Sequence, residues 1–432
     1  MQKKLVWHDW FFWAGAFFLL GVLLGSATNN FSYKIFYTLI ATILVAVFLK
    51  LKDGHLNYLV VFILVGAVYF YFFTYWQKLP APIFNQKIKM EAVVKSSNLK
   101  IDGQELVVRP FDGARGILPP IKIQILRYPE YGYGDEIQIE GKIQKVESPY
   151  VVGIMYRPQI SLVRANDSWT LYGTLFKIRK SFQENLKKVL PYNQAVFLSG
   201  LTVGGKSEFS KELQEKFKTS GTAHLVALSG YNITIIVTYL GGFFAYFFSR
   251  KKSLWLATLF IILFVMMSGA EASIVRAAIM GMILVVAEQS GRLFSIRNAL
   301  LAAALVMVVI NPKILVWDLG FQLSFLAMIG LAYIQPFLDK KIKFKFWFKK
   351  EILQTISAET MVLPLIFLKI GQITLAGIVT NPLVAYFLPL TMGLGFLTGA
   401  VGFISYYLSL PIAVLVNILL TYELAIINLF SK

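Results

Sequence analysis

The stretch TSGTAHLVALSGYNIT, residues Thr219–Thr234, decides how we interpret the fold. It leads into the apolar run Ile235–Phe248, and the two together are long enough to cross a bilayer. Two glycines bracket His224 and Ser229, and glycine at such positions permits a broken helix. Polar groups at the mouth of a span are costly unless they are paired or face water. The stretch therefore predicts either a capped helix start with a satisfied histidine or a polar entrance to a path through the membrane.

Composition indicates a polytopic α-helical membrane protein. Of the 432 residues 57% are hydrophobic, and the mean hydropathy is +0.64, whereas soluble domains average roughly 45–50% apolar residues. The net charge of +19 is weak evidence for nucleic acid, because positive loops also set the orientation of spans. With no cysteine and three scattered histidines, a thiolate or histidine-rich metal centre is excluded, and we expect no cofactor.

The apolar runs predict about eleven transmembrane helices, some of them broken. They are expected at about Trp10–Gly25, Tyr33–Leu49, Leu56–Trp76, Leu225–Phe248, Leu254–Ser268, Ser273–Glu288, Ile296–Ile310, Leu319–Phe337, Ile352–Ile370, Leu375–Phe396 and Val401–Phe430. The first run also resembles a secretory signal, but the runs that follow it favour an uncleaved span. Pro364 and Pro389 predict two interrupted spans. Lysine and arginine in alternate loops place the N-terminus in the cytoplasm.

The chain divides into four parts. Residues 1–78 form N-terminal transmembrane helices, residues 79–170 an inserted extracellular domain, residues 171–220 amphipathic interfacial helices, and residues 221–432 a transmembrane channel domain. In the interfacial part, the apolar stripe of Leu175, Phe182 and Leu186 predicts a helix lying on the membrane.

Alternating short runs such as Ile121–Leu126 predict that the inserted domain is a small OB-like β-barrel. Many such barrels bind single-stranded nucleic acid through basic grooves and stacked aromatic rings. The candidate DNA-binding residues of the barrel are Lys87, Lys89, Arg109, Lys122, Arg127 and Tyr128. Acidic residues nearly balance the basic ones here, so an ordinary solvated surface explains the pattern equally well.

One sequence motif matches a nucleotide-binding pattern but lacks the structural context that the pattern needs. The run GLTVGGKS, residues Gly200–Ser207, matches the phosphate-binding P-loop pattern. That mechanism needs a buried strand before the loop and an apolar helix after it, whereas a helix-like segment precedes it and charged residues follow. We therefore do not expect nucleotide binding.

Further polar side chains fall at or within the predicted spans. Ser273 and Arg276 share one helical side, and Asp318 and Gln322 lie one turn apart. Such groups are rare in lipid and usually face a partner or water. A buried pair of Arg276 with Asp318 or Glu271 would lock helices together, and a shared water-filled path is the alternative.

In their order and spacing these residues resemble the ComEC family of competence membrane channels. The resemblance runs through HLVALSG (residues His224–Gly230), Gly269 with Arg276, and DLGFQLSF (residues Asp318–Phe325), and it continues to Asn381 and Pro389. It implies a channel that carries single-stranded DNA across the bacterial cytoplasmic membrane in natural transformation, with the barrel outside. The implied DNA path is lined by His224, Ser229, Asn232, Ser273, Arg276, Asp318, Gln322, Ser324, Glu359 and Asn381.

Two other functions stay open. A transporter of another anionic solute or polymer could use the same lining. An intramembrane hydrolase would use Ser229 as nucleophile and His224 as base, although we expect no enzyme. The DNA channel implies single-stranded DNA and membrane lipid as partners, with a separate ATPase or helicase for motive force. Whether the chain forms a homo-oligomer is left open.

The chain departs from the family pattern in three respects. Many relatives have a second histidine where this chain has Tyr231-Asn232-Ile233. Full-length relatives often end in a metallo-β-lactamase-like domain, but no His-x-His-x-Asp-His cluster occurs here and the sequence ends at Lys432. We therefore expect a separate nuclease. The disulfide usual in the family's barrel is impossible without cysteine.

Overall fold

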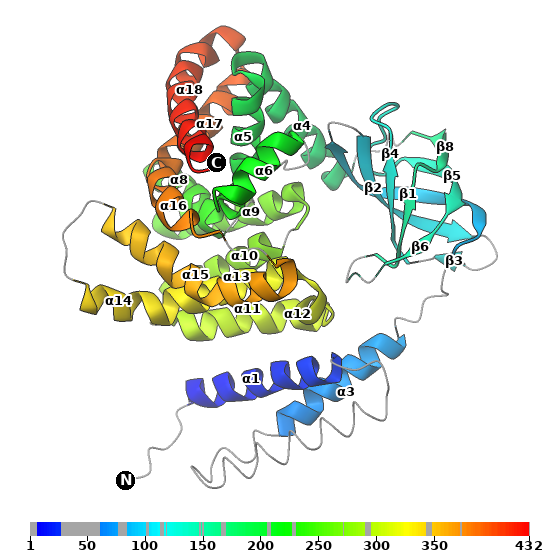
Figure 1. Cartoon of the computed structure of the whole chain (residues 1–432), viewed down its shortest axis with the longest axis horizontal. Helices are drawn as coiled ribbons and strands as arrows, with labels where there is room; N and C mark the ends of the chain where they lie inside the picture. The colour runs from blue at the N-terminus through cyan, green and yellow to red at the C-terminus, as the bar shows by residue number, and fades with distance from the viewer. Residues whose placement is uncertain are drawn as a thin grey trace.

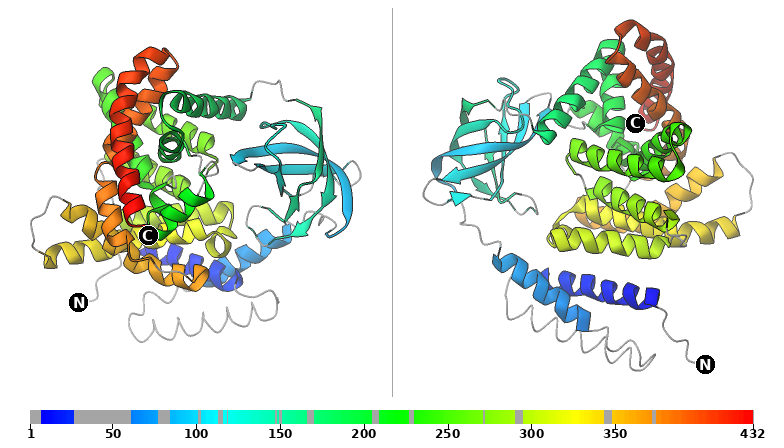
Figure 2. Two further views of the ribbon diagram at one scale, coloured as in Figure 1. Left: turned by 45° about the horizontal axis from the view of Figure 1, so that its top comes forward. Right: turned by 180° about the vertical axis from the view of Figure 1, so that it is seen from behind.

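The computed structural model describes most of the chain as helices and one separate sheet (Figure 1). The described residues are 7–26, 61–76, 84–100, 103–112, 116–117, 119–146, 148, 151–165, 170–204, 209–226, 230–270, 272–289, 295–342, 348–371 and 374–431. Figure 2 shows from two further sides that the sheet stands beside the helices rather than among them.

Of the helices that the structure describes, two precede the sheet and the others follow it. The first two are α1 (Trp7–Ser26) and α3 (Val61–Trp76). The others are α4 (Leu171–Val189), α5 (Tyr192–Thr202), α6 (Lys211–Thr219), α7 (Ala223–Val226), α8 (Gly230–Phe247), α9 (Arg250–Ser268), α10 (Ala272–Gln289), α11 (Ile296–Ile310), α12 (Ile314–Trp317), α13 (Leu319–Ile329), the π-helix η3 (Gly330–Ile334), α14 (Gln335–Lys341), α15 (Lys349–Ile370), α16 (Gly377–Ala385), α17 (Leu388–Gly402) and α18 (Tyr406–Leu429).

Among the described residues, four helices are long and apolar enough to cross a membrane. They are Lys251–Ser268, Leu319–Lys341, Lys349–Lys369 and Tyr406–Leu429. The bent pair α16 and α17 would make a fifth, and four shorter apolar helices add to them. The fold is therefore that of a helical membrane protein. The count of eleven spans stays a prediction, and the expected span Tyr33–Leu49 lies outside the described residues.

The predicted interruptions are correct at one place and wrong at another. The α16–α17 pair bends by 49° at Tyr386 and Phe387, close to the expected break. By contrast, α15 runs unbroken through Pro364, so the interruption predicted there is wrong. A proline removes one helical hydrogen bond, and a long helix packed against neighbours can continue through that loss. The last predicted span begins too early, because α17 extends to Gly402 and α18 starts at Tyr406.

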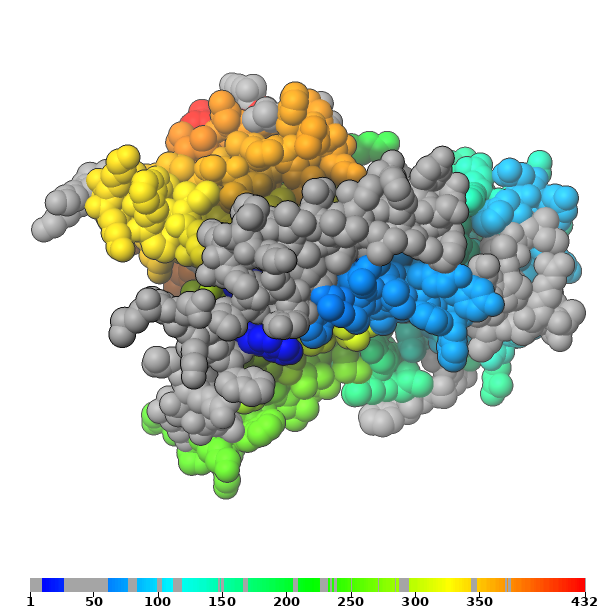
Figure 3. Space-filling model, turned by 90° about the horizontal axis from the view of Figure 1, so that it is seen from below, coloured from blue at the N-terminus to red at the C-terminus, as the bar shows by residue number. Residues whose placement is uncertain are grey.

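Helices α1 and α3 cross at close range through glycines. A Cβ atom at Gly21 would meet the backbone of Ile63, and one at Gly66 would meet the backbone of Phe18. Small residues at a crossing let two membrane helices approach closely. Helix α1 also packs on α11, and parts of α1 and α3 are visible at the surface when the molecule is seen from below (Figure 3).

The sheet has eight strands in the order β6-β7-β4-β2-β1-β5-β8, with β3 paired to β2. The strands are β1 (Lys87–Lys100), β2 (Gly103–Asp112), β3 (Gly116–Ile117), β4 (Ile121–Ile125), β5 (Glu136–Lys142), β6 (Gln144–Lys145), β7 (Gly153–Tyr156) and β8 (Gln159–Arg164). As the alternating sequence predicts, Ile121, Ile123, Ile137 and Ile139 are fully buried on one face. The strand ladder is not closed, so the sheet is separate and curved around its core, and the OB-like barrel stays a prediction.

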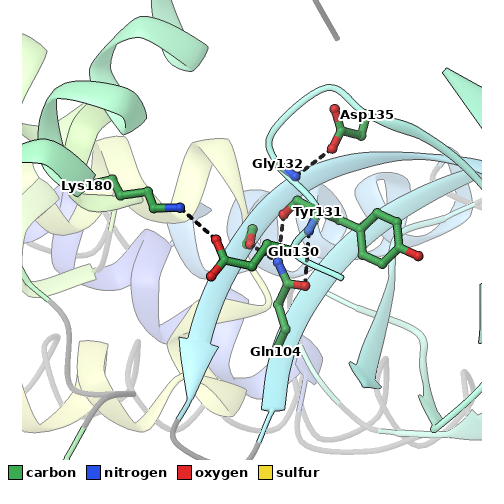
Figure 4. Close-up of polar contacts among 7 residues, drawn as sticks. Gln104, Glu130, Tyr131, Gly132, Asp135 and Lys180 are labelled. Atoms are coloured by element: carbon green, nitrogen blue, oxygen red, sulfur yellow. Dashed lines mark hydrogen bonds and ion pairs between the residues drawn. The ribbon is translucent and has the colours of Figure 1, made fainter. Parts of the chain in front are cut away.

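The sheet is attached to the helices through α4. Glu130, in the loop between β4 and β5, accepts an ion-paired hydrogen bond from Lys180 of α4 at 2.7 Å (Figure 4). Gln104 donates to the carbonyl of Tyr131 at 2.7 Å and accepts from its amide at 3.2 Å, which fixes the same loop. The ring of Tyr133 stacks on that of Tyr172 in α4, with centroids 5.7 Å apart.

Helix α4 is amphipathic, as predicted, and its apolar stripe is covered by protein. Leu175, Phe182 and Leu186 are buried, and the helix packs on α9 and α17. Gly399 of α17 leaves the space that the Phe182 ring fills. The placement of α4 at a membrane surface stays a prediction.

Candidate functional site

A half-buried carboxylate on α15, Glu359, marks the first cluster of polar groups. The Asn381 amide of α16 donates to Oε1 of Glu359 at 3.3 Å, and Asn381 is only 2% exposed. Among the described residues, Oε2 of Glu359 and Oδ1 of Asn381 are buried and have no hydrogen-bond partner. Buried polar atoms without partners are uncommon in folded proteins and call for an explanation such as a bound substrate or water.

A glycine makes this contact possible. Gly377 lies one helical turn before Asn381, and a Cβ atom there would be 2.8 Å from Oε1 of Glu359 and 3.1 Å from Nδ2 of Asn381. The carbonyl oxygen of Gly221 would lie 3.2 Å from the same Cβ atom. These three polar groups lie around the position where any other residue would have its Cβ atom. A larger residue at position 377 would therefore push them apart.

The segment that follows α6 reaches this cluster through a glycine-capped turn. Gly221 has a φ of +73°, and its amide donates to the carbonyl of Lys218 at 3.0 Å. A left-handed glycine after the last helical residue is a common way to end a helix. Thr222 is fully buried, and its hydroxyl lies 2.7 Å from that of Ser220. The turn thus presents the Gly221 backbone to α16.

His224 follows on the short helix α7. Its side chain is exposed, and the Gly221 backbone is within hydrogen-bonding reach of its ring. The segment of His224 therefore lies beside the Glu359–Asn381 contact, which the sequence did not show. Ser229 lies outside the described residues, so its position relative to His224 is not part of this site.

A second cluster forms where α10 packs on α13. Arg276 is 5% exposed, and its Nη1 donates to the backbone carbonyl of Ser324 at 2.7 Å. Its guanidinium carbon lies 5.9 Å from the centre of the Phe325 ring. Within the part of the chain that the structure describes, Nε of Arg276 has no partner, and Arg276 does not contact Asp318. Ser273 lies one turn earlier on α10 and is half-buried.

Asp318 and Gln322 stabilise the break between α12 and α13. The Asp318 carboxylate caps α13 by accepting from the amide of Phe321 at 3.0 Å. The Gln322 side chain donates to the carbonyls of Leu315 and Val316 at 2.9 Å and 2.8 Å. Both side chains satisfy backbone groups that a helix end leaves open, and this structural role accounts for them.

Asn232 also has a structural role. It is fully buried on α8, and its amide donates to the carbonyl of Leu201 in the last turn of α5 at 3.1 Å. The same turn excludes the P-loop interpretation of the run that begins at Gly200. A P-loop follows a strand, whereas Gly200–Thr202 ends helix α5.

The candidate residues of the sheet do not form one basic groove. Lys87 pairs with Glu140 at 2.8 Å, and Lys122 pairs with Glu105 at 2.7 Å. The hydrogen bond from Lys87 lowers the pKa of the Glu140 carboxyl below its usual value. Lys89 and Arg109 are exposed on the outer face, whereas Arg127 stacks over Tyr128 in the loop after β4, with its guanidinium carbon 5.8 Å from the ring centre.

A buried pair that the sequence analysis missed joins α17 to α18. The hydroxyl of Thr391 donates to Oε1 of Glu423 at 2.6 Å, and neither side chain is exposed. The other oxygen, Oε2 of Glu423, is buried and has no partner among the described residues. The signal was present, because Glu423 falls inside a predicted span, where carboxylates are rare.

These observations define the class of protein to which the chain belongs. The protein is a helical membrane protein whose interior holds incompletely paired polar groups, and among the described residues these include a cluster around Glu359, a cluster around Arg276 and the Thr391–Glu423 pair. Comparison with known proteins then gives the family, since the model of the Competence protein family matches residues 201–432, more than half of the chain. The chain belongs to this family, and both clusters lie in the matched part.

One characterised relative supports the assignment. ComE operon protein 3 of Bacillus subtilis (strain 168) is 30% identical over 161 residues, which are 36% of this chain. The match spans 20% of that protein's own length. No solved structure matches the chain significantly.

Proposed function

We propose that this protein takes part in DNA uptake for competence and carries single-stranded DNA across the bacterial cytoplasmic membrane. The observation that carries the proposal is that the family match covers both clusters of unpaired polar groups. In this proposal the protein is a conduit and not an enzyme, the N-terminus lies in the cytoplasm and the sheet lies outside.

The two clusters differ in the kind of hydrogen bond that they leave unmade. The unpaired Nε of Arg276 is a donor, which suits a phosphate oxygen. The unpaired oxygens of Glu359 and Asn381 are acceptors, which suit the amino and imino groups of nucleobases. A duplex hides those base groups in pairing, whereas a single strand presents them together with its phosphates. This division supports a single strand as the substrate.

The strand order supports an OB-like form of the outer domain. Strands β7 and β8 are separated only by Arg157 and Pro158. Strand β7 pairs in parallel with β4, and β8 pairs antiparallel with β5. One bent segment therefore contacts both sides of the ladder, as a closing strand would. On this domain, the exposed ring of Tyr128 is the best candidate to stack on incoming DNA, and the half-buried guanidinium of Arg127 beside it is the best candidate to attract it.

Motive force and strand degradation are assigned to other proteins. In this proposal a separate ATPase or helicase pulls the strand, and a separate nuclease removes its complement. Both would act as partners of the channel, together with membrane lipid.

The experiment uses a naturally competent bacterium whose own family member has been deleted and replaced by this chain. Labelled donor DNA is supplied, and nuclease-resistant single strands in the cytoplasm are measured. We expect the chain to restore uptake, Arg276→Gln to lower it at least tenfold, and Arg276→Lys to retain part of it. The matched control is Lys188→Gln, which removes an exposed positive charge from α4 and is expected to leave uptake unchanged.

Membrane levels of each variant are measured alongside by immunoblot. Uptake at the wild-type rate in the deletion strain without this chain would reject the assay, and failure of a well-expressed chain to restore uptake would count against the proposed role. Wild-type uptake by a well-expressed Arg276→Gln variant would show that the strand does not pass the second cluster.

A further inference from the structure

An open hollow of about 470 Å³ lies where α8 turns into α9. Its walls are the side chains of Phe248, Trp255 and Leu256, with Lys251 and Lys252 beside them. The turn is fixed from below, because the Ser253 hydroxyl of α9 donates to the Gly241 carbonyl of α8 at 3.1 Å. The structure thus holds a largely apolar recess next to two lysines at one end of a helical hairpin.

The positive charge at this recess is uncompensated. Lys251 and Lys252 are exposed, and neither has an ion-pair partner among the described residues. The first turn of α9 contains no acidic residue, and Ser249 makes no side-chain cap to it. Lysines at a helix N-terminus face the positive end of the helix dipole, which is unfavourable unless an anion lies between them.

The surroundings are those of a membrane surface. Trp255 is 56% exposed, and Phe247 at the end of α8 is 62% exposed. Exposed aromatic rings next to lysines are typical of the level at which lipid headgroups meet acyl chains. A free anion in water would satisfy the lysines but would leave the apolar walls uncovered, and a hydrocarbon chain alone would do the reverse.

We propose that this recess binds a glycerophospholipid with a net negative headgroup, such as phosphatidylglycerol. The phosphate lies against Lys251 and Lys252, and the first part of an acyl chain covers Phe248, Trp255 and Leu256. A zwitterionic lipid has the same phosphate and chains but carries its own cation, which the two lysines repel. The site therefore selects anionic lipid by charge and holds it by apolar contact.

The test uses the full chain in lipid nanodiscs and the fluorescence of Trp255. Brominated phosphatidylglycerol or brominated phosphatidylcholine is titrated into a phosphatidylcholine bilayer, since bromine quenches tryptophan on contact. The signal of Trp255 is the difference between the wild type and Trp255→Phe. We expect phosphatidylglycerol to quench the Trp255 fluorescence at a mole fraction about twenty-five-fold lower than phosphatidylcholine does, since each of the two lysines contributes about fivefold.

The variants separate charge from general effects. Lys251→Gln with Lys252→Gln is expected to abolish the preference, and Lys251→Arg with Lys252→Arg to retain it. The matched control, Lys142→Gln with Lys145→Gln on exposed sheet positions, loses the same charge and is expected to keep the preference. Equal quenching by both lipids, or a preference that survives the two glutamine substitutions, would overturn the proposal. Displacement of brominated phosphatidylglycerol by a single-stranded oligonucleotide would also overturn it, because the recess would then belong to nucleic acid. The measurement needs no DNA uptake, so its outcome is independent of the proposed function.

Discussion

Replacing Gly221 by alanine tests whether the turn after α6 holds the first cluster together. Gly221 has a φ of +73°, and a Cβ atom there would lie 2.7 Å from Cα and 2.8 Å from the backbone nitrogen of Gly377. Both contacts are with backbone, so no side-chain rotation relieves them. Either the turn or α16 has to move, and with it the carbonyl of Gly221 or the amide of Asn381.

The loss of folding free energy caused by Gly221→Ala has two parts, and a control variant can separate them. A left-handed backbone costs an alanine about 1–2 kcal/mol, and overpacking of this kind adds about 1–3 kcal/mol. Gly371 has nearly the same φ, +76°, but a Cβ atom there meets nothing within 4 Å. Gly371→Ala therefore shows the first part alone, and Gly221→Ala shows both.

Thermal unfolding in detergent, followed by tryptophan fluorescence, measures the difference. The matched domain, residues 201–432, falls in the range of 150–250 residues for which 1 kcal/mol of unfolding free energy shifts the midpoint by about 2–4 °C. The overpacking cost of about 1–3 kcal/mol therefore corresponds to an unfolding midpoint roughly 2–12 °C lower for Gly221→Ala than for Gly371→Ala. DNA uptake is measured on the same variants, and we expect it to fall much further for Gly221→Ala. Equal midpoints and equal uptake for the two variants would refute the view that this backbone contact builds the site.

Three further predictions concern contacts outside that turn. Thr391→Val leaves the buried Glu423 carboxyl without its donor and should destabilise the protein by about 1–3 kcal/mol in the same unfolding assay, whereas Thr391→Ser should not; equal losses for the two would contradict the role of the hydroxyl. The hydrogen bond to Glu130 raises the pKa of Lys180, and because both groups are partly exposed the pair stabilises the fold by at most about 0.5 kcal/mol. This stability should be present at neutral pH and be lost as the pH rises above the ordinary lysine value of about 10.4. Glu130→Gln should remove that pH dependence, and an unchanged pH profile of stability would argue against the pair. Gly66→Ala should destabilise the packing of α1 on α3 by about 1–3 kcal/mol, and the control Gly241→Ala, which has open space around its Cβ position, should not; midpoints that agree would show that the α1–α3 crossing tolerates a side chain.

The sequence predicted those parts of the fold that depend on local pattern. Alternation in Ile121–Leu126 predicted a strand with one buried face, and Ile121 and Ile123 are fully buried. The stripe containing Phe182 and Leu186 predicted α4. Pattern could not show what covers each face, and it did not indicate that the apolar stripe of α4 packs on α9 and α17. Pattern also misjudged Pro364, because the effect of a proline depends on the neighbours that support the helix.

The candidate site shows a similar division. Glu359 and Asn381 were both selected because amides and carboxylates are rare in spans, but nothing in the sequence indicated that they touch. They come from different helices, and their contact depends on the absence of a side chain at Gly377. Nothing in the sequence marked Gly377 as part of a site, and nothing indicated that Gly221 lies next to it. A pair of Arg276 with Asp318 or Glu271 was one of two alternatives; Arg276 donates instead to the backbone carbonyl of Ser324, and Glu271 lies outside the described residues.

Polar side chains that already hydrogen-bond to the backbone are poor candidates for contacts with a substrate, and this leaves few candidates. Where helices end inside the membrane part, their free backbone groups need partners, because lipid supplies none. Asp318 and Gln322 provide such partners at the α12–α13 break, and Asn232 provides one at the end of α5. These three side chains are used up by the fold, so a polymer that passed them would have to compete with the hydrogen bonds that hold the helices. Arg276, Glu359 and Glu423 each keep a buried polar atom without a partner among the described residues after their internal contacts are made, and of these three Arg276 and Glu359 were predicted to line the path. If the proposed function is correct, the strand should exchange its hydrogen bonds with water for bonds to Arg276 and Glu359, because there it gains partners without breaking the hydrogen bonds that hold the helices.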